Sequence, residues 1–180
     1  MFPTETSTFV VQIDMTMRDT KFELLRSRIL LSEALSRIIE IARPKIESMG
    51  HELITDLPVD PIVLDADESR LKQIFLNLLS NSAKFTAPGG QIWVTAKLVG
   101  NEVVVSVRDN GIGIPSENLP KIFDIFSRIS RSREPGTGSF GLGVVQFLVE
   151  MHGGTVTATS GGKDQGSEFT VRLPVIHESL

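Results

Sequence analysis

The stretch "ESRLKQIFLNLLSNSAKF", residues 68–85, decides the fold that this sequence predicts. Its large apolar residues recur every three or four positions, which is typical of a helix with one buried face; they are Leu71, Ile74, Phe75, Leu78, Leu79 and Phe85. Directly afterwards, Pro88-Gly89-Gly90 turns the chain. The pattern therefore predicts a helix from about Glu68 to Lys84 that packs on a core.

A polar stripe runs along the same predicted helix, beside its apolar face. At about 100° per residue, five polar side chains fall within roughly 40° of Asn77, and the apolar set centres about 120 to 130° away; the five are Arg70, Gln73, Asn77, Asn81 and Lys84. Asparagine is a mediocre helix former, so two asparagines four positions apart are unusual inside a helix. The helix alone is compatible with a cleft wall or with an ordinary solvated flank.

Helical and extended segments alternate on both sides of this helix. Upstream, a helical period begins at Ser32, a candidate N-cap, and Gly50 is expected to end that helix. The remaining segments predict strands, with a hairpin at Gly100-Asn101, and a helix from about Leu142 to Met151; the strand segments are "HELITDLP" (51–58), "PIVLDAD" (61–67), "QIWVTAKLV" (91–99), "EVVVSVRD" (102–109), "TVTATS" (155–160) and "SEFTVRLP" (167–174). This mixture predicts an α+β sandwich with helices on one face of a sheet.

Length and composition predict one soluble globular domain. The 180 residues are 41% hydrophobic and 22% charged, and the net charge of −4 with dispersed basic residues disfavours nucleic-acid binding. The absence of cysteine excludes disulfides, thiolate nucleophiles and cysteine-based metal sites. No apolar stretch approaches the length of a membrane span, so we expect this chain to insert in no membrane.

A glycine-rich turn, "RDNGIGIP" at residues 108–115, follows a predicted strand. Gly111 and Gly113 allow backbone conformations or close approaches that a Cβ would block. By itself this Asp-x-Gly-x-Gly pattern is equally compatible with a tight turn, because Asp-Asn-Gly is a common turn sequence.

Four motifs in order give the sequence a specific resemblance. They are "NLLSNSAKF" (77–85), "DNGIGIP" (109–115), "IFDIF" (122–126), and the glycine stretch that leads into "FLVEMHGG" (147–154). Together they resemble the ATP-binding catalytic domain of sensor histidine kinases, in the GHKL superfamily. The resemblance implies the Bergerat fold, a two-layer α/β sandwich with a mixed, mostly antiparallel sheet. It also implies a domain at residues 21–176, preceded by a connector at 1–20 and followed by a tail at 177–180.

The resemblance implies a role for each polar residue near the end of the predicted helix. Asn77 and Asn81 would face the triphosphate, with Asn81 the better ligand for Mg²⁺ through its side-chain oxygen. Lys84 would meet phosphate charge, and Phe85, where the family often has tyrosine, would pack near the nucleotide. These three polar residues are also the implied catalytic residues.

The glycine-rich turn and the phenylalanine motif would supply the other nucleotide contacts. The resemblance implies that Asp109 accepts a hydrogen bond from the adenine amino group and that Gly111, Gly113 and Ile114 line the site. Phe123 would be either core or part of the phenylalanine motif, whereas Phe126 and Arg128 would influence a nucleotide lid.

The stretch "PGTGSFGLGVV", residues 135–145, is predicted to cover the phosphates. Two alignments to the family pattern remain open. In one, Gly141 and Leu142 match while Thr137 and Ser139 occupy usual glycine positions. In the other, Gly136-Thr137-Gly138 matches and Ser139-Phe140 is an insertion.

None of the three histidines is interpreted as the phosphate acceptor, and His177, near the terminus, carries no signal. His51, in "GHELITDLP", superficially resembles a phosphoacceptor motif but follows a helix-ending glycine, so a loop and the start of a strand is preferred. His152 fits the end of the last helix, where a histidine can contact exposed carbonyls. The chain is therefore expected to lack its own phosphate acceptor.

The resemblance implies a cytoplasmic kinase fragment whose parent can be membrane-anchored. It would bind ATP or ADP with Mg²⁺ and deliver the γ-phosphoryl group to a histidine on a separate dimerisation domain, upstream of a response regulator. Alone it should turn over little. The alternatives are another GHKL-type ATPase, a protein-serine kinase, or a degenerate domain that docks partners without nucleotide.

Overall fold

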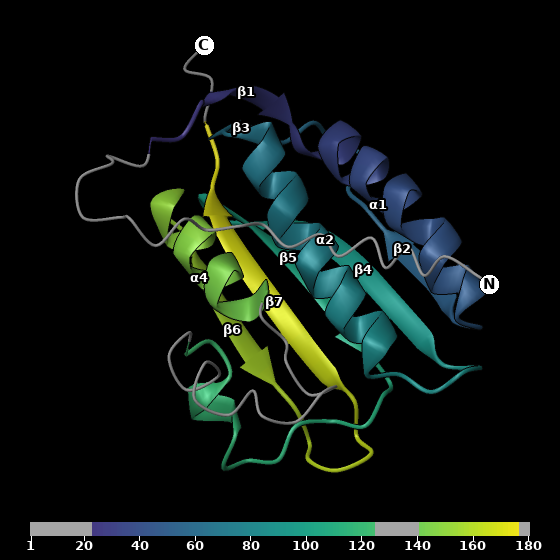
Figure 1. Cartoon of the computed structure of the whole chain (residues 1–180). Helices are drawn as coiled ribbons and strands as arrows, with labels where there is room; N and C mark the ends of the chain where they lie inside the picture. Colours follow the sequence, from purple (N-terminus) through teal and green to yellow (C-terminus); the bar gives the residue numbers. More distant parts are fainter. Residues whose placement is uncertain (1–22, 125–140, 177–180) are drawn as a thin grey trace, which may run out of the picture.

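The computed structural model describes residues 23–124 and 141–176 (Figure 1). The strands in these ranges are β1 (Ser27–Leu30), β2 (Glu52–Asp56), β3 (Val63–Ala66), β4 (Gln91–Val99), β5 (Glu102–Asp109), β6 (Thr155–Thr159) and β7 (Ser167–Pro174). The helices are α1 (Leu31–Ser48), α2 (Glu68–Lys84), α4 (Gly141–Met151) and a short 3-10 helix, η1 (Leu119–Lys121). The predicted connector at residues 1–20 and tail at 177–180 lie outside the described residues.

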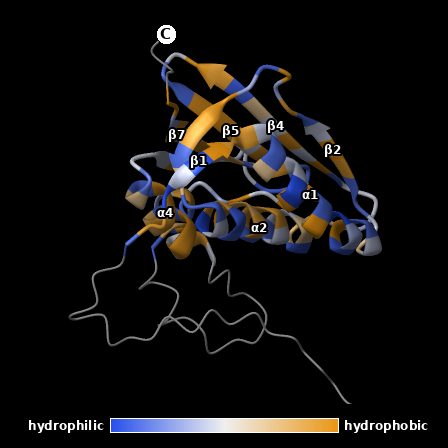
Figure 2. Cartoon of the chain, turned by 90° about the horizontal axis from the view of Figure 1, so that it is seen from above, coloured by the Kyte–Doolittle hydropathy of each residue, from blue (hydrophilic) through white to orange (hydrophobic). Residues whose placement is uncertain are grey.

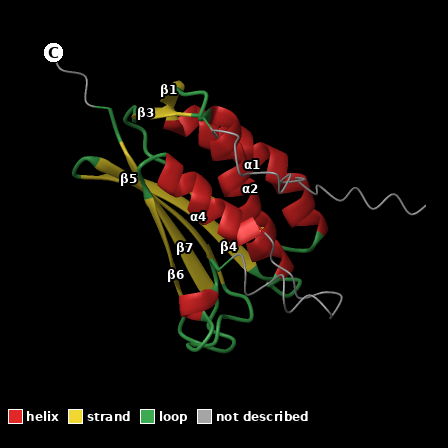
Figure 3. Cartoon of the chain, turned by 60° about the vertical axis from the view of Figure 1, so that its left-hand side comes forward, coloured by secondary structure: helices red, strands yellow, loops and turns green. Residues whose placement is uncertain are grey.

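The elements form two layers, with α1, α2 and α4 on one face of a five-stranded sheet (Figure 3). The strand order is β2-β4-β5-β7-β6, in which β2 and β4 are parallel and the other neighbours are antiparallel. Strands β1 and β3 form a separate antiparallel pair. The predicted α+β sandwich with a mixed, mostly antiparallel sheet is confirmed.

The core lies between the helices and the sheet. Val103, Val105 and Val107 point from β5 toward the helices and are fully buried, because every second residue of a strand faces the same side of the sheet. From the other layer, α2 contributes Ile74 and Phe75, exposed by 1% or less. Hydrophilic and hydrophobic residues alternate around the helices in Figure 2, because each helix buries only one side.

Helix α2 spans the predicted residues, but the predicted cap of α1 was wrong. Helix α1 begins at Leu31, with Leu30 at the N-cap position and no side-chain cap hydrogen bond. The amide of Leu31 instead donates to the carbonyl oxygen of Ile62 at 2.9 Å. A backbone carbonyl from the neighbouring loop therefore satisfies an amide that a capping side chain would otherwise serve. Gly50 does follow the end of α1, at a φ of +82°.

Candidate functional site

The polar stripe of α2 lies at the edge of the core. Arg70, Gln73, Asn77 and Asn81 are half-buried, and Lys84 is exposed. The side-chain amide of Asn77 donates to the carbonyl oxygen of Gly141 over a long 3.5 Å. Within residues 23–124 and 141–176, the side chains of Asn81 and Lys84 form no hydrogen bond; Lys84 Nζ lies 5.3 Å from the centroid of the Phe85 ring. Within the stripe, Arg70 Nη1 donates to Gln73 Oε1 at 3.1 Å. The polar groups that the described part of the protein leaves available are therefore those of Asn81 and Lys84, toward the C-terminal end of α2.

Asp109 ends β5 as a buried acceptor, with 3% of its surface exposed. Its Oδ1 accepts hydrogen bonds from the amides of Gly111 at 2.9 Å and Ser167 at 3.3 Å. Its Oδ2 accepts one from the hydroxyl of Ser167 at 2.9 Å. Since an ionised carboxylate offers about four acceptor positions, one remains on Oδ2 for an N–H donor outside the protein.

Ser167 is a residue that the sequence interpretation missed. It begins β7, directly beside Asp109 in the register of β5 and β7. The signal was present, because strand alternation places Ser167 on the same face as the buried Phe169 and Val171. A small hydroxyl at an inward position next to an inward carboxylate indicates a hydrogen bond that orients the acid.

The glycines after Asp109 serve close approaches, as predicted. A Cβ on Gly111 would overlap the carbonyl oxygen of Phe85, and one on Gly113, whose φ is +71°, would overlap that of Gly162. The amide of Ile112 also donates to the carbonyl of Phe85 at 3.0 Å. The loop at residues 109–114 is therefore fastened to the C-terminal end of α2, and this brings the loop close to Asn81 and Lys84.

Helix α4 begins at Gly141, where a Cβ would come within 3.0 Å of Asn77 Cγ. Leu142 is buried. Phe123 packs edge-to-face on Phe169 at 6.2 Å between ring centroids, so it belongs to the core. The remaining predicted site residues lie outside the described residues; they are Phe126, Arg128, Gly136, Thr137, Gly138, Ser139 and Phe140.

The N-terminal end of α2 carries a second buried acid, Asp67. Its carboxylate accepts hydrogen bonds from the amide of Leu25 at 2.9 Å, the hydroxyl of Ser69 at 2.9 Å and the amide of Arg70 at 3.2 Å. Burial alone would raise the pKa of Asp67, but these hydrogen bonds and the charge of Arg70 together hold that pKa below its usual value. Asp67 therefore caps α2 in its ionised form.

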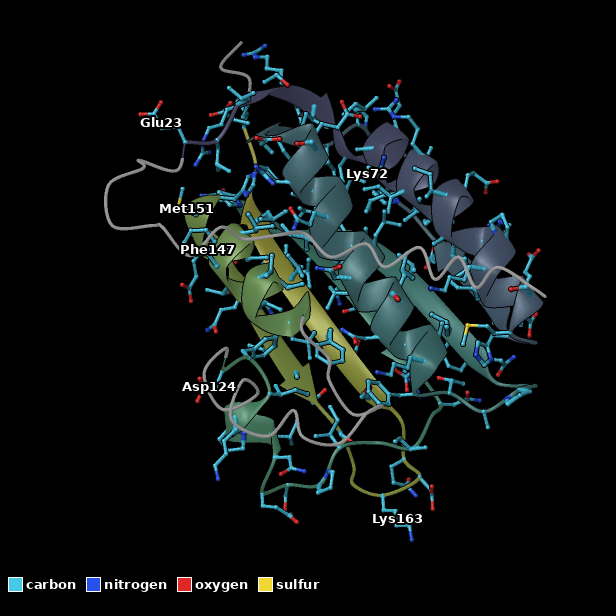
Figure 4. The ribbon with its side chains drawn as sticks, viewed as in Figure 1. Glu23, Lys72, Asp124, Phe147, Met151 and Lys163 are labelled. Atoms are coloured by element: carbon cyan, nitrogen blue, oxygen red, sulfur yellow. The ribbon has the colours of Figure 1, made fainter. Side chains whose placement is uncertain are left out.

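His152 joins the same end of α2 to the end of α4. Its Nε2 accepts a hydrogen bond from the amide of Asp67 at 3.1 Å, so Nδ1 carries the proton and donates to the carbonyl of Leu148 at 2.7 Å. The same end of α4 is held by a second contact, because the side chain of Arg26 donates to the carbonyl of Met151, the last residue of α4, at 2.8 Å. Met151 and Glu23 mark this end of the molecule in Figure 4. This arrangement agrees with the interpretation of His152 as a structural residue.

His51 is also held inside the protein. It is 4% exposed, and its Nε2 lies 2.8 Å from the carbonyl oxygen of Ala83, in the last turn of α2. It precedes β2, as the preferred interpretation requires. This position does not suit a residue that must be reached by a phosphoryl group.

Residues 23–124 and 141–176 contain no group of three or more His, Asp or Glu side chains that could hold a metal ion. The donors at the stripe are amide oxygens of Asn77 and Asn81. Mg²⁺ accepts such hard oxygen ligands and keeps several waters when it is held together with substrate phosphates. The stripe therefore fits an Mg²⁺ ion that arrives with a phosphate ligand, rather than one held by the protein alone.

One hollow lies beside the loop that joins β6 and β7. It has a volume of about 230 Å³, and its lining includes Asp109, Ser160 and Ser167 together with Arg108, Thr159 and Glu168. The last three are cross-strand neighbours that face away from the helices, whereas Asp109 and Ser167 lie on the inward face of β5 and β7. The hollow therefore reaches Asp109, and none of the described residues that line it belongs to α2.

None of the helices in the described ranges has the length and apolar character needed to cross a membrane.

The chain matches known proteins over most of its length. Residues 66–177 match the family described as histidine kinase-, DNA gyrase B-, and HSP90-like ATPase.

Among curated proteins, the chain is 39% identical over 127 residues to the probable sensor histidine kinase TcrY of Mycobacterium tuberculosis. It is 36% identical over 153 residues to the adaptive-response sensory kinase SasA of Synechococcus elongatus. These matches cover 69% and 84% of this chain, but only 26% and 39% of those relatives. The chain thus spans a minor part of the length of either relative.

Among solved structures, the chain is similar to the catalytic domain of histidine kinase ThkA, with a TM-score of 0.72 and 25% identity. That match covers 83% of this chain and 95% of the other. Full-length ShkA in complex with AMPPNP gives a TM-score of 0.74 and 28% identity, over 89% of this chain and 33% of that one.

Proposed function

The chain belongs to the family of histidine kinase-, DNA gyrase B- and HSP90-like ATPases, and from that premise we propose that it is the ATP-binding catalytic domain of a sensor histidine kinase. It delivers the γ-phosphoryl group of ATP to a histidine on a dimerisation domain. One observation carries this proposal. The loop that begins at the buried Asp109 is hydrogen-bonded to Phe85, directly after the half-buried polar stripe of α2.

Asp109 binds the adenine end of the nucleotide. Its remaining acceptor position suits the exocyclic amino group of adenine, which is an N–H donor. Gly111, Gly113 and Ile114 shape the wall beside the base, because their backbone follows Asp109 directly. Phe85 lies between this wall and the stripe.

Asn77, Asn81 and Lys84 bind the phosphate end. Asn81 and Asn77 would hold Mg²⁺ through their side-chain oxygens, and when bound the ion would neutralise phosphate charge. Lys84 adds a positive charge on the same stripe. Gly141 and Leu142 supply amides at the N-terminus of α4, where helix amides favour anions. The residues proposed outside the described ranges, Phe126, Arg128 and 136–140, would cover the nucleotide.

The chemistry requires positioning more than proton transfer from this chain. Phosphoryl transfer depends on alignment of the reacting groups and on neutralisation of charge. The polar residues of α2 orient the triphosphate, and the acceptor histidine comes from the dimerisation domain. The two histidines in the described residues, His51 and His152, are both buried and bonded to carbonyls, which supports an acceptor elsewhere.

The partners follow from the same proposal. They are ATP or ADP, the dimerisation and phosphoacceptor domain of the parent kinase, and a response regulator downstream. A solved complex of ThkA with the response regulator TrrA contains a kinase of similar fold. We propose a cytoplasmic location for this domain, in a parent that can be membrane-anchored.

Two measurements separate this proposal from its alternatives. The first is ATP binding by the chain with Mg²⁺, which a nucleotide-independent docking domain would lack. The second is phosphorylation of a histidine when the dimerisation domain is supplied. A related ATPase would instead release phosphate alone, and for that it would need a group that activates water; Asn77 and Gln73 are amides and are poor bases.

A further inference from the structure

The β6–β7 loop, residues 160–166, holds the loop that follows Asp109. The two loops lie side by side at one end of the sheet in Figures 1 and 3. Their contact is made of hydrogen bonds. The amide of Asp164 donates to the carbonyl of Ile112 at 2.8 Å, and that of Gly166 to the carbonyl of Gly111 at 3.1 Å.

Ser160 is the side chain at the centre of this contact. Its hydroxyl oxygen accepts hydrogen bonds from the amides of Ile114 at 3.0 Å and Gly162 at 3.2 Å. The hydroxyl donates to the carbonyl of Gly166 at 2.6 Å. A serine hydroxyl offers one donor and two acceptor positions, so all three are used inside the protein. One side chain therefore closes the β6–β7 loop and also fastens the loop that follows Asp109.

The β6–β7 loop needs such a fastening because its backbone is unusual. Gly162, Asp164 and Gly166 all have positive φ angles, of 105°, 61° and 67°. Aspartate adopts this conformation more readily than most residues, but it still does so at a cost. The hydroxyl of Ser160 bonds the backbone of both glycines and so fixes the loop in this shape.

The opposing surfaces leave little freedom. A Cβ on Gly113 would overlap the carbonyl oxygen of Gly162, and a Cβ on Gly166 would overlap that of Asp109. The two backbones therefore touch at both ends of the contact. A shift of the β6–β7 loop would push directly on the residues next to the Asp109 carboxylate.

We infer that Ser160 is a positioning residue for the adenine end of the nucleotide site. The inference rests on the proposed function, because Asp109 and Ile114 are placed at that end. Ser160 acts through the backbone of Ile114 and through the β6–β7 loop, which continues into Ser167, the residue that orients Asp109. It makes no hydrogen bond to α2 or α4 within the described residues, so the phosphate end should not depend on it.

The test compares Ser160→Ala with Gln165→Ala in the full chain. Gln165 lies in the same loop and is exposed, but its side chain forms no hydrogen bond with the described residues, so it is the matched control. Amide hydrogen exchange of the nucleotide-free chain is followed by NMR. We expect exchange at Ile114 to accelerate about ten-fold in Ser160→Ala and to stay unchanged in Gln165→Ala, since only the first variant loses the hydrogen bond of the Ile114 amide.

The second readout is affinity for adenosine and for ATP with Mg²⁺. Ser160→Ala should weaken both by the same factor, roughly five- to ten-fold, because only contacts to the base are disturbed. A larger loss for ATP than for adenosine would overturn the assignment to the adenine end. A uniform rise in exchange that includes Val105, in the middle of β5, would show a merely structural role.

The two proposals fail in different ways. If the unmutated chain binds no nucleotide, the proposed function fails, while exchange at Ile114 still decides whether Ser160 holds the loop. If the chain binds ATP but exchange at Ile114 is unchanged in Ser160→Ala, the inference fails alone. Should Ser160→Ala not fold, Ser160→Cys replaces it, because a thiol keeps nearly the same volume but is a weak hydrogen-bonding group.

Discussion

The two ends of helix α2 use their polar residues differently. At the N-terminal end, Asp67 accepts three hydrogen bonds from the protein, and the backbone amide of Asp67 is itself bonded to His152. Toward the C-terminal end, Asn77 makes one long hydrogen bond, and Asn81 makes none with the described residues. Polar groups that the protein satisfies indicate a structural role, whereas half-buried polar groups left available indicate a binding site.

Asp109 is hydrogen-bonded within the protein and is also proposed to bind adenine, so its loss should have the largest effect on binding. Asp109→Asn replaces one acceptor oxygen by a donor, so the bond to the adenine amino group is lost. A hydrogen bond to a charged group contributes about 1.5 to 3 kcal/mol, so ATP affinity should fall at least ten-fold. Calorimetry measures the ATP affinity of the variant, and an unchanged affinity would contradict the proposed adenine-binding role of Asp109. Asp109→Ala is less clean, because it also removes three hydrogen bonds within the protein.

Asn81→Ala should weaken ATP binding by about five-fold in the presence of Mg²⁺, because a neutral hydrogen bond or ligand contributes about 1 kcal/mol. The unfolding temperature should not fall, since Asn81 makes no side-chain hydrogen bond with the described residues and alanine is a better helix former than asparagine. Repeating the titration with EDTA in place of Mg²⁺ should remove most of the difference between the variant and the unmutated chain. A difference that persists without metal would argue against a metal ligand.

Asp67→Ala should show the opposite pattern. Loss of a helix N-cap costs about 1 kcal/mol, which lowers the unfolding temperature of a domain of this size by roughly 2 to 4 °C. ATP affinity should change less than two-fold, because Asp67 lies at the far end of α2 from Asn81 and Lys84. A variant that lost ATP binding with no loss of stability would reverse the comparison between the two ends.

The stability of the chain should also depend on Asp67 in acid. The pKa of Asp67 is lower in the folded chain than its usual value, so the unfolded chain binds the proton more readily. The stabilisation that ionised Asp67 contributes to the folded chain is therefore complete above about pH 4 to 5. It is lost as the pH falls through the pKa of Asp67 in the folded chain. Denaturant titrations between pH 3 and pH 6 should show a shallower acid slope for Asp67→Asn than for the unmutated chain.

Lys84→Met should have the smallest effect. Lys84 is exposed, so its attraction to phosphate is screened, and we expect a two- to three-fold loss of ATP affinity at low salt. The loss should shrink as salt rises. Lys72→Met is the matched control, because Lys72 is an exposed lysine on the same helix that lies outside the stripe (Figure 4). Equal losses in both variants would remove any specific role for Lys84.

Local sequence patterns were sufficient to predict most of the fold. The apolar period of α2 and the alternation of β4 and β5 gave bounds that agree with the structure. Ser32 was mistaken for a cap because the carbonyl of Ile62, more than 30 residues away, serves the amide of Leu31. Side-chain caps are encoded locally, whereas such a long-range backbone hydrogen bond has no local signal.

The candidate site shows the same difference between local signals, which the sequence reveals, and long-range contacts, which it does not. Asn77, Asn81 and Lys84 were predicted as site residues from the helical period and Asp109 from a short motif, because each signal lies within a few residues. Ser160 and Ser167 were missed as functional residues, since they act on a loop about 50 residues earlier in the chain. Their hydroxyls have meaning only once β5, β6 and β7 are paired.

The most direct test of the account is a calorimetric titration of the unmutated chain with ATP in the presence of Mg²⁺. The account predicts saturable binding of one ATP per chain, which Asp109→Asn weakens and Asp67→Asn leaves nearly unchanged. Absence of saturable binding at millimolar ATP, or equal weakening by both substitutions, would contradict the claim that α2 and Asp109 form an ATP site.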